Sequence, residues 1–158
     1  MSDKIQTVEA LAETAVRLRR EGRKLVATNG CFDLLHVGHV RYLRAARDLG
    51  DCLAVGLNGD KSVRQLKGAG RPLNRADDRA EVLAALEAVD YVAVFPELRA
   101  SQFLRTVRPA IYVKGGDYTP ETLDRDEKEA LAAIGAEIVI IPFAHGYSTS
   151  GLIDSARS

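Results

Sequence analysis

One stretch of the chain, Asn29–Ala46 (NGCFDLLHVGHVRYLRAA), links a strand pattern to a helical pattern through a turn that contains glycine. The preceding run, Lys24-Leu-Val-Ala-Thr28, is apolar and β-branched, and apolar residues then recur at helical spacing over about 39–49. A strand, a turn and a helix in this order aim the free N–H groups and the positive dipole end of the helix at the edge of a sheet. The stretch therefore predicts a site that favours an anion.

The rest of the chain repeats this alternation of strand and helix. Near-continuous apolar strands are typical of a parallel sheet covered on both faces, and right-handed crossovers then give a doubly wound, Rossmann-like α/β fold. We expect one five-stranded sheet in a single domain, 1–158, with an N-terminal helix inside 1–22 and a catalytic core at 23–158. The expected strands are 24–28, 52–57, 91–95, 110–113 and 137–141. The expected helices are 7–20, 39–49, 76–88, 99–107 and 121–134, with a last short one from about Ser150.

The composition is that of an ordinary globular protein. Of the 158 residues 46% are hydrophobic and 28% charged, and 22 Lys and Arg balance 22 Asp and Glu. This balance argues against nucleic acid or a membrane surface as a partner, because both attract a basic excess. No signal peptide pattern and no run of about 20 apolar residues is present, so a cytoplasmic location is expected. Cys31 and Cys52 lack zinc spacing and are interpreted as reduced, mostly buried thiols.

Polar and glycine residues follow the expected strands at their carboxyl ends, where ligands bind in such sheets. The loop 67–74 carries Lys67 and Arg71, whose charges suit an anion that arrives and leaves. The residues at the other strand ends are Asn29, Gly30, Asp33, His36 and His39 after the first strand, Asn58, Gly59 and Asp60 after the second, Lys114–Asp117 after the fourth and His145–Thr149 after the fifth.

His36 and His39 are two of the three histidines in the chain and flank Gly38. Their three-residue separation lets both rings face one point if the turn wraps around it. Walker A and GxGxxG phosphate motifs are absent from the sequence. Imidazoles that donate to phosphate oxygens neutralise the charge that develops when a phosphorus atom is attacked. The pair therefore favours phosphoryl or nucleotidyl transfer without a role as nucleophile.

Other interpretations of the histidines are open. A zinc site needs about four ligands, and only His145 and two scattered cysteines could join the pair. Histidines at a helix start also serve as surface or capping residues. A Ser-His-Asp hydrolase would need Ser148 in a nucleophile elbow, and the chain contains no GxSxG motif.

Three further features have a functional and a structural interpretation. In Lys114-Gly-Gly-Asp-Tyr118 the glycines allow close approach of a ligand, but the stretch could equally be an ordinary turn. Gly146–Gly151 could bind phosphate at the start of the last helix or form only its N-cap. Arg79 could be a solvated helix residue or a basic contact that reaches the cleft.

Asn29-Gly-Cys-Phe-Asp-Leu-Leu-His-Val-Gly-His39 resembles the (T/N)-G-x-F-D-x-x-H-x-G-H signature of the cytidylyltransferase-like nucleotidyltransferases. Further matches resemble the adenylyltransferase part of ADP-heptose synthase, and together they cover about 24–157. HxGH alone is shared with many enzymes, including class I aminoacyl-tRNA synthetases, whereas its combination with VKGGDY is more specific. The further matches are 57–60, 71–74, Arg79, 86–91, 113–118 and 148–149.

The resemblance implies that a phosphate oxygen of D-glycero-β-D-manno-heptose 1-phosphate attacks the α-phosphorus of ATP, with Mg²⁺ on the pyrophosphate that leaves. The implied catalytic residues are His36, His39 and Lys67. The implied nucleotide-binding residues are Asn29, Gly30, Phe32, Asp33, Gly38, Arg71, Lys114, Gly115, Asp117, Ser148 and Thr149. Weaker substrate or secondary contacts are Asn58, Asp60, Arg79 and His145. No residue is assigned as a dedicated metal ligand.

The chain departs from the family pattern before Ser148. Relatives that use CTP carry an arginine shortly before an S-T-T block, whereas His145 is the basic residue here and Ser150 replaces the second threonine. Transfer to another acceptor, such as glycerol 3-phosphate or flavin mononucleotide, and a nucleotide-binding regulator without turnover are the alternatives. The resemblance further implies a homo-oligomer, as a dimer, and a free-standing adenylyltransferase whose sugar phosphate comes from a separate kinase.

Overall fold

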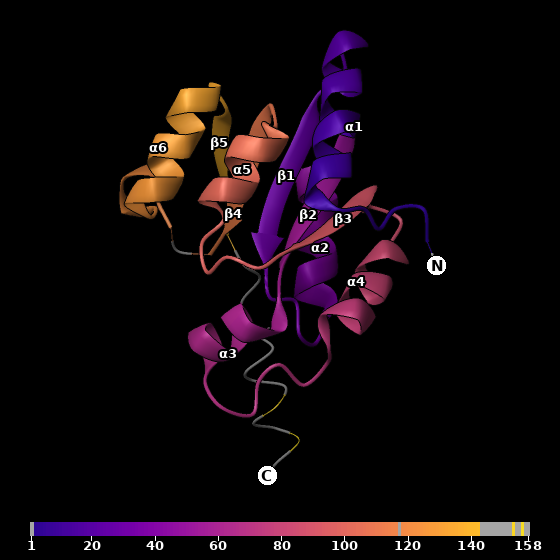
Figure 1. Ribbon diagram of the computed structural model, residues 1–158, viewed down its shortest axis with the longest axis vertical. Helices are drawn as coiled ribbons and strands as arrows, with labels where there is room; N and C mark the ends of the chain where they lie inside the picture. The colour runs from indigo at the N-terminus through magenta and orange to yellow at the C-terminus, as the bar shows by residue number, and fades with distance from the viewer. Residues whose placement is uncertain (1, 117, 143–152, 154–155, 157–158) are drawn as a thin grey trace.

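The computed structural model describes residues 2–116, 118–142, 153 and 156. Five parallel strands form one sheet in the order β3-β2-β1-β4-β5, so the strand order reverses beside β1. The carboxyl ends of the strands point toward α3 (Figure 1). The elements are α1 (Val8–Arg20), β1 (Leu25–Gly30), α2 (Val37–Arg47), β2 (Cys52–Asn58), α3 (Asp60–Lys67), α4 (Ala76–Ala84), β3 (Tyr91–Phe95), α5 (Ser101–Val107), β4 (Ile111–Gly115), η1 (Pro120–Thr122), α6 (Arg125–Ile134) and β5 (Glu137–Ile141).

Helices cover both faces of the sheet (Figure 1). Alternate strand residues point to opposite faces, so Ala27 packs in the cluster with α1, α5 and α6, whereas Val26 packs with α2 and α4. All seven residues of β2 are buried, as a central strand with two covered faces requires. Burial of this apolar surface is the main favourable contribution to folding. The predicted five-stranded, doubly wound parallel sheet is confirmed.

The sequence patterns missed α3. No helix was expected between the strand at 52–57 and the loop at 67–74, but residues 60–67 form two helical turns. The segment is short and has only two apolar residues, Val63 and Leu66, too few to reveal a helical pattern in the sequence. The helix expected over 121–134 is divided into η1 and α6, because Asp124 caps α6 by accepting the backbone N–H groups of Asp126 and Glu127.

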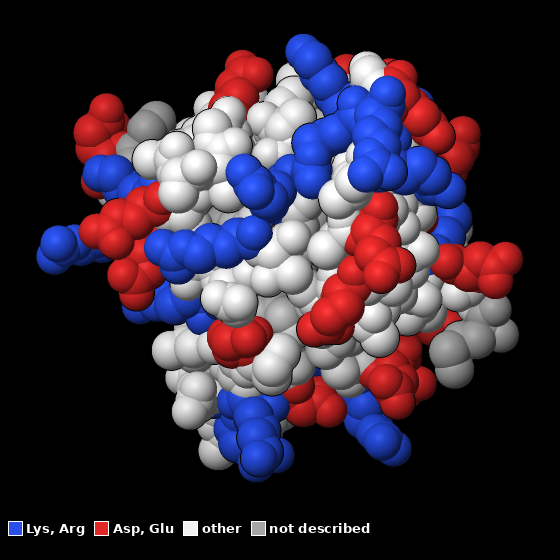
Figure 2. All heavy atoms as spheres, turned by 45° about the horizontal axis from the view of Figure 1, so that its top comes forward, with Lys and Arg blue, Asp and Glu red and all other residues white. Residues whose placement is uncertain are grey.

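The charged residues are mixed on the surface. Figure 2 brings the upper end of Figure 1 forward and shows basic side chains gathered along part of this face, with acidic side chains beside them. Within the described parts of the chain, no helix combines the length and apolarity needed to cross a membrane. The short helix expected from about Ser150 falls largely outside the described residues, although Ile153 and Ala156 are helical.

Candidate active site

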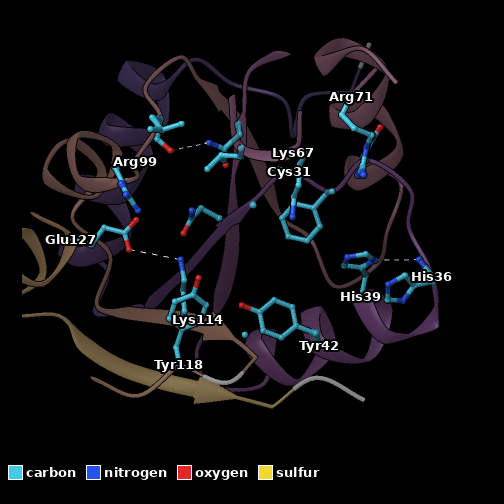
Figure 3. A pocket seen from close by; sticks show the side chains of 18 residues that line it. Cys31, His36, His39, Tyr42, Lys67, Arg71, Arg99, Lys114, Tyr118 and Glu127 are labelled. Atoms are coloured by element: carbon cyan, nitrogen blue, oxygen red, sulfur yellow. Dashed lines mark hydrogen bonds and ion pairs between the residues drawn. The ribbon is translucent and has the colours of Figure 1, made fainter. Parts of the chain in front are cut away.

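A cavity of about 470 Å³ lies at the carboxyl ends of the strands, where the order of the sheet reverses (Figure 3). This is the position at which open α/β sheets bind ligands. It is lined by Asn29, Gly30, Cys31, Phe32, Asp33, His36, His39, Tyr42, Asn58, Leu66, Lys67, Arg71, Leu98, Arg99, Lys114, Gly115, Tyr118 and Glu127.

Most of the site residues expected from the sequence meet in this cavity. Those that line it are Asn29, Gly30, Phe32, Asp33, His36, His39, Asn58, Lys67, Arg71, Lys114 and Gly115. Gly38, Asp60 and Arg79 do not line it. Asp117, His145, Ser148 and Thr149 lie outside the described residues.

The two histidines form the start of α2. His36 is the N-cap, and its Nδ1 accepts the N–H of Gly38 at 3.1 Å. Nδ1 of His39, one turn into the helix, accepts the N–H of His36 at 3.3 Å. The ring centroids are 4.0 Å apart, and the His39 ring lies 5.5 Å from that of Phe32. Both rings cap the helix and also line the cavity, so the capping interpretation does not exclude the functional one.

Capping fixes the tautomer of each neutral ring. A nitrogen that accepts a backbone N–H carries no proton, so in a neutral imidazole the proton lies on Nε2. Burial, with a smaller contribution from the charge of His36, lowers the pKa of His39 to about 4. Burial also lowers the pKa of His36. Near pH 7 both rings are therefore neutral Nε2–H donors with fixed orientations.

We expect an NMR titration of the free protein to show the His39 ring neutral down to about pH 5, because burial disfavours its charged form. Adding a nucleoside triphosphate analogue should raise this pKa, since a nearby anion favours imidazolium. An ordinary His39 pKa near 6.5 in the free protein would contradict the structure.

The same shift predicts how stability depends on pH. The unfolded chain binds a proton at His39 near pH 6.5, whereas the folded protein resists protonation down to about pH 4. Between these values the unfolded state holds more protons, so the contribution of His39 to the free energy of unfolding falls as the pH is lowered. The loss is complete below about pH 4.

Two cations, Lys67 and Arg71, line the cavity together with the histidines (Figure 3). Lys67 is the last residue of α3, which ends at Gly68 with a φ of 98° that favours glycine. Arg71 follows in the next loop, and its side chain is 12% exposed. The missed helix α3 therefore forms part of the cavity wall, where it places Lys67.

Arg79 lies beneath the cavity wall, and its side chain has no exposed area. It donates to the carbonyls of Cys31, Asn58 and Asn74 at 2.7, 2.9 and 2.9 Å, and to Asp60 Oδ1 at 2.7 Å. Its four donations join the loop after β1, the end of β2 and the loop before α4. Arg79 is therefore an internal brace of the site, and Asp60 is its partner.

Sequence reasoning missed Glu127, which lies beside the expected residue Lys114 at the other end of the cavity. Glu127 is buried, accepts the N–H of Ala100 at 3.3 Å and lies 3.8 Å from Lys114 Nζ. Lys114 Nζ also lies 4.8 Å from the ring centre of Tyr118. Glu127 is a buried acidic residue in an amphipathic helix, and that break in the pattern of α6 is the signal that could have identified it.

Tyr42 is another missed residue of the cavity floor. Its hydroxyl donates to the carbonyl of Val113 at 3.2 Å and lies 2.6 Å from Thr28 Oγ1. Burial raises the pKa of Tyr42 to about 12, although the hydrogen bond with Thr28 opposes the shift. Tyr42 thereby ties α2 to β1 and β4 below the histidines.

Among the described residues, no group of three or more His, Cys, Asp or Glu side chains is arranged to hold a metal ion. At the histidine end Asp33 is the lining carboxylate, and both its oxygens accept hydrogen bonds from the protein. These donors do not form a Mg²⁺ cage. A Mg²⁺ ion that enters with a nucleotide needs only the phosphate oxygens and few protein ligands.

The comparisons with known proteins agree with this geometry. A family model described as cytidylyltransferase-like matches residues 27–154. The chain is 48% identical over 155 residues to the bifunctional protein HldE of Geotalea uraniireducens. This match covers 98% of this chain and 31% of that protein. It is 49% identical over 151 residues to HldE of Syntrophotalea carbinolica, covering 96% of this chain and 30% of that protein. The chain thus spans less than a third of these curated relatives.

A solved structure shares the fold. It is described as the lipopolysaccharide core biosynthesis protein from Thermoplasma volcanium, with a TM-score of 0.64 and 27% sequence identity. The match covers 78% of this chain and 98% of the other.

Proposed function

The chain belongs to the cytidylyltransferase-like family, and from this premise we propose that it transfers AMP from ATP to D-glycero-β-D-manno-heptose 1-phosphate, giving ADP-heptose and pyrophosphate. The observation that carries the proposal is the capped histidine pair, whose Nδ1 atoms accept backbone N–H groups in a cavity that also holds Lys67 and Arg71. The choice of heptose 1-phosphate as the acceptor is supported by the VKGGDY resemblance and by the HldE relatives, whose matches cover nearly all of this chain.

The proposed chemistry is one in-line displacement at phosphorus. A phosphate oxygen of the acceptor forms a bond to the α-phosphorus of ATP, and the bond between this phosphorus and the bridging oxygen of pyrophosphate breaks. The acceptor phosphate is already largely ionised at neutral pH, because its second pKa is near 6, so no side chain need remove a proton. What remains for the protein is to position the two substrates and stabilise the developing charge.

His36 and His39 supply that stabilisation in the proposed mechanism. Their Nε2–H groups would donate to oxygens of the α-phosphoryl group, and both orientations are set before the substrate arrives. A neutral ring still donates through Nε2–H while Nδ1 accepts the capping N–H, so the lowered pKa is compatible with this task. Lys67 and Arg71 would hold the outer phosphates, which leave as pyrophosphate.

The opposite end of the cavity suits the uncharged nucleoside. There Lys114 is paired with Glu127, and Tyr118 adds an aromatic surface that is 45% exposed. A buried carboxylate repels phosphate, so this end favours hydroxyl and ring groups over a second anion. Lys114 and Gly115 would therefore frame the adenosine, with the triphosphate directed toward the histidines.

We propose that Mg²⁺ arrives as the MgATP complex, held by phosphate oxygens, and that the protein acts in the cytoplasm as a homodimer. The heptose must carry a phosphate on its anomeric oxygen before transfer, so a kinase reaction, proposed to reside in a separate protein, has to precede this one.

The test is pyrophosphate release with ATP, CTP, GTP and UTP against a panel of sugar 1-phosphates and alcohol phosphates in the presence of Mg²⁺. We expect turnover with ATP and heptose 1-phosphate, and little with CTP and glycerol 3-phosphate. The reverse preference would overturn the proposed substrates. Nucleotide binding without turnover of any pair would instead favour a regulator, and the His39→Asn variant serves as the background control.

A further inference from the structure

The loop that carries Arg71 is anchored on Asp33, a residue expected from the sequence to bind nucleotide. Asp33 Oδ2 accepts Arg71 Nε at 2.8 Å and the N–H of Leu73 at 2.7 Å, and Oδ1 accepts the N–H of Asn74 at 2.9 Å. Asn74 Nδ2 donates back to the carbonyl of Asp33 at 3.0 Å. The Asp33 side chain has no exposed area, so it is committed to this loop.

These contacts also keep Asp33 ionised. Burial alone would raise its pKa, but the N–H groups of Leu73 and Asn74 and the Arg71 guanidinium outweigh burial and hold the pKa below its ordinary value. A carboxylate within a site for polyphosphate would normally repel the ligand. Here the Asp33 carboxylate accepts hydrogen bonds from three donors and holds them in place. Asp33 therefore organises the anion site, while its own charge is turned toward the protein.

The geometry of the ion pair determines which edge of Arg71 remains for a ligand. Asp33 binds the guanidinium through Nε, and within the described residues the two terminal nitrogens make no hydrogen bond or ion pair. Those nitrogens carry four of the five donors of the side chain. Arg71 lines the cavity on the same side as His39 (Figure 3). The pair thus presents a fixed, two-pronged donor to the cavity.

We propose that Asp33 is a positioning residue, which aims Arg71 at the phosphates of the nucleotide and joins the Arg71 loop to the turn that carries the histidines. The identity of this anion rests on the proposed function. Asp33 lies three residues before His36, so one carboxylate fixes the loop against the same turn that carries the first imidazole. The alternative is that Asp33 only folds the loop, with no effect on the ligand through Arg71.

A double-mutant cycle on MgATP binding separates these roles. Asp33→Asn, Arg71→Met and the double variant are compared with the original protein by calorimetry, without acceptor. We expect each single change to weaken MgATP binding by about tenfold or more, because charge-assisted hydrogen bonds are lost or misdirected. The double variant should bind about as weakly as Arg71→Met alone, since Asp33 acts through Arg71. If the two changes weaken MgATP binding independently, so that their fold-losses multiply in the double variant, the proposal is overturned.

Further variants keep the test decisive. If Asp33→Asn does not fold, Asp33→Glu retains the charge but displaces it, and the same cycle with Arg71→Met applies. Arg64→Met removes an exposed cation near the end of α3 and should change binding by less than about twofold, as screened surface charges do. If Asp33→Asn no longer weakens MgATP binding in the Arg71→Met variant, the proposal is supported, even if the acceptor differs from the proposed sugar phosphate. Failure of the original protein to bind MgATP would instead refute the proposed function.

Discussion

Replacing His39 by asparagine is expected to lower kcat by about 100- to 1,000-fold, the usual cost of losing one preorganised donor to a developing oxyanion. Asparagine is the informative replacement, because its side-chain oxygen can accept the N–H of His36 as Nδ1 does now, at 3.3 Å. The helix cap is thereby retained while the Nε2 donor is removed. Steady-state rates of pyrophosphate release, with KM for each substrate, measure the effect.

Two companion variants separate catalysis from folding. His39→Gln can place an amide N–H near the position of Nε2 and should recover part of the rate. His39→Ala removes the cap as well as the donor, so it should also lose about 0.5–2 kcal/mol of stability. Normal turnover in a folded His39→Asn protein would assign this histidine to capping alone.

The sheet was predictable because its signals are local. Each strand is an apolar run, and parallel pairing on two covered faces follows from those runs without knowledge of any long-range contact. The histidine turn was predictable for a related reason: the two imidazoles, the glycine and the helix are contiguous, so their spacing alone fixes their relative positions. Helix α3 was missed because its eight residues include only two apolar ones, Val63 and Leu66, which is too short a pattern to recognise.

The partners of the site residues were less predictable, because they depend on contacts across the fold. Glu127 meets Lys114 only after α6 packs beside the sheet, 13 positions along the chain. Asp33 meets Arg71 38 positions away. The sequence identified Lys114 but not Glu127, and it identified both Asp33 and Arg71 but assigned each to the nucleotide. The folded chain also joins the members of each pair to one another.

Arg79 illustrates this difference most clearly and carries the second large prediction. Replacing it by methionine is expected to lower the free energy of unfolding by about 3–5 kcal/mol, as removal of one member of a buried charged network does. Methionine fills much of the volume but leaves the carbonyls of Cys31, Asn58 and Asn74 without their donor. Urea unfolding measures the change, and the melting temperature should fall by about 2–4 °C for each kcal/mol.

The matched control is Arg75→Met, which removes an exposed arginine just before the same helix and should change stability by less than about 0.5 kcal/mol. Arg79→Lys should be intermediate, since an ammonium keeps the charge but cannot reach four acceptors with a planar fork. If Arg79→Met were as stable as the control yet lost affinity for the sugar phosphate, the arginine would be a ligand contact. The structure argues against that result, because all three carbonyls and Asp60 already surround a side chain with no exposed area.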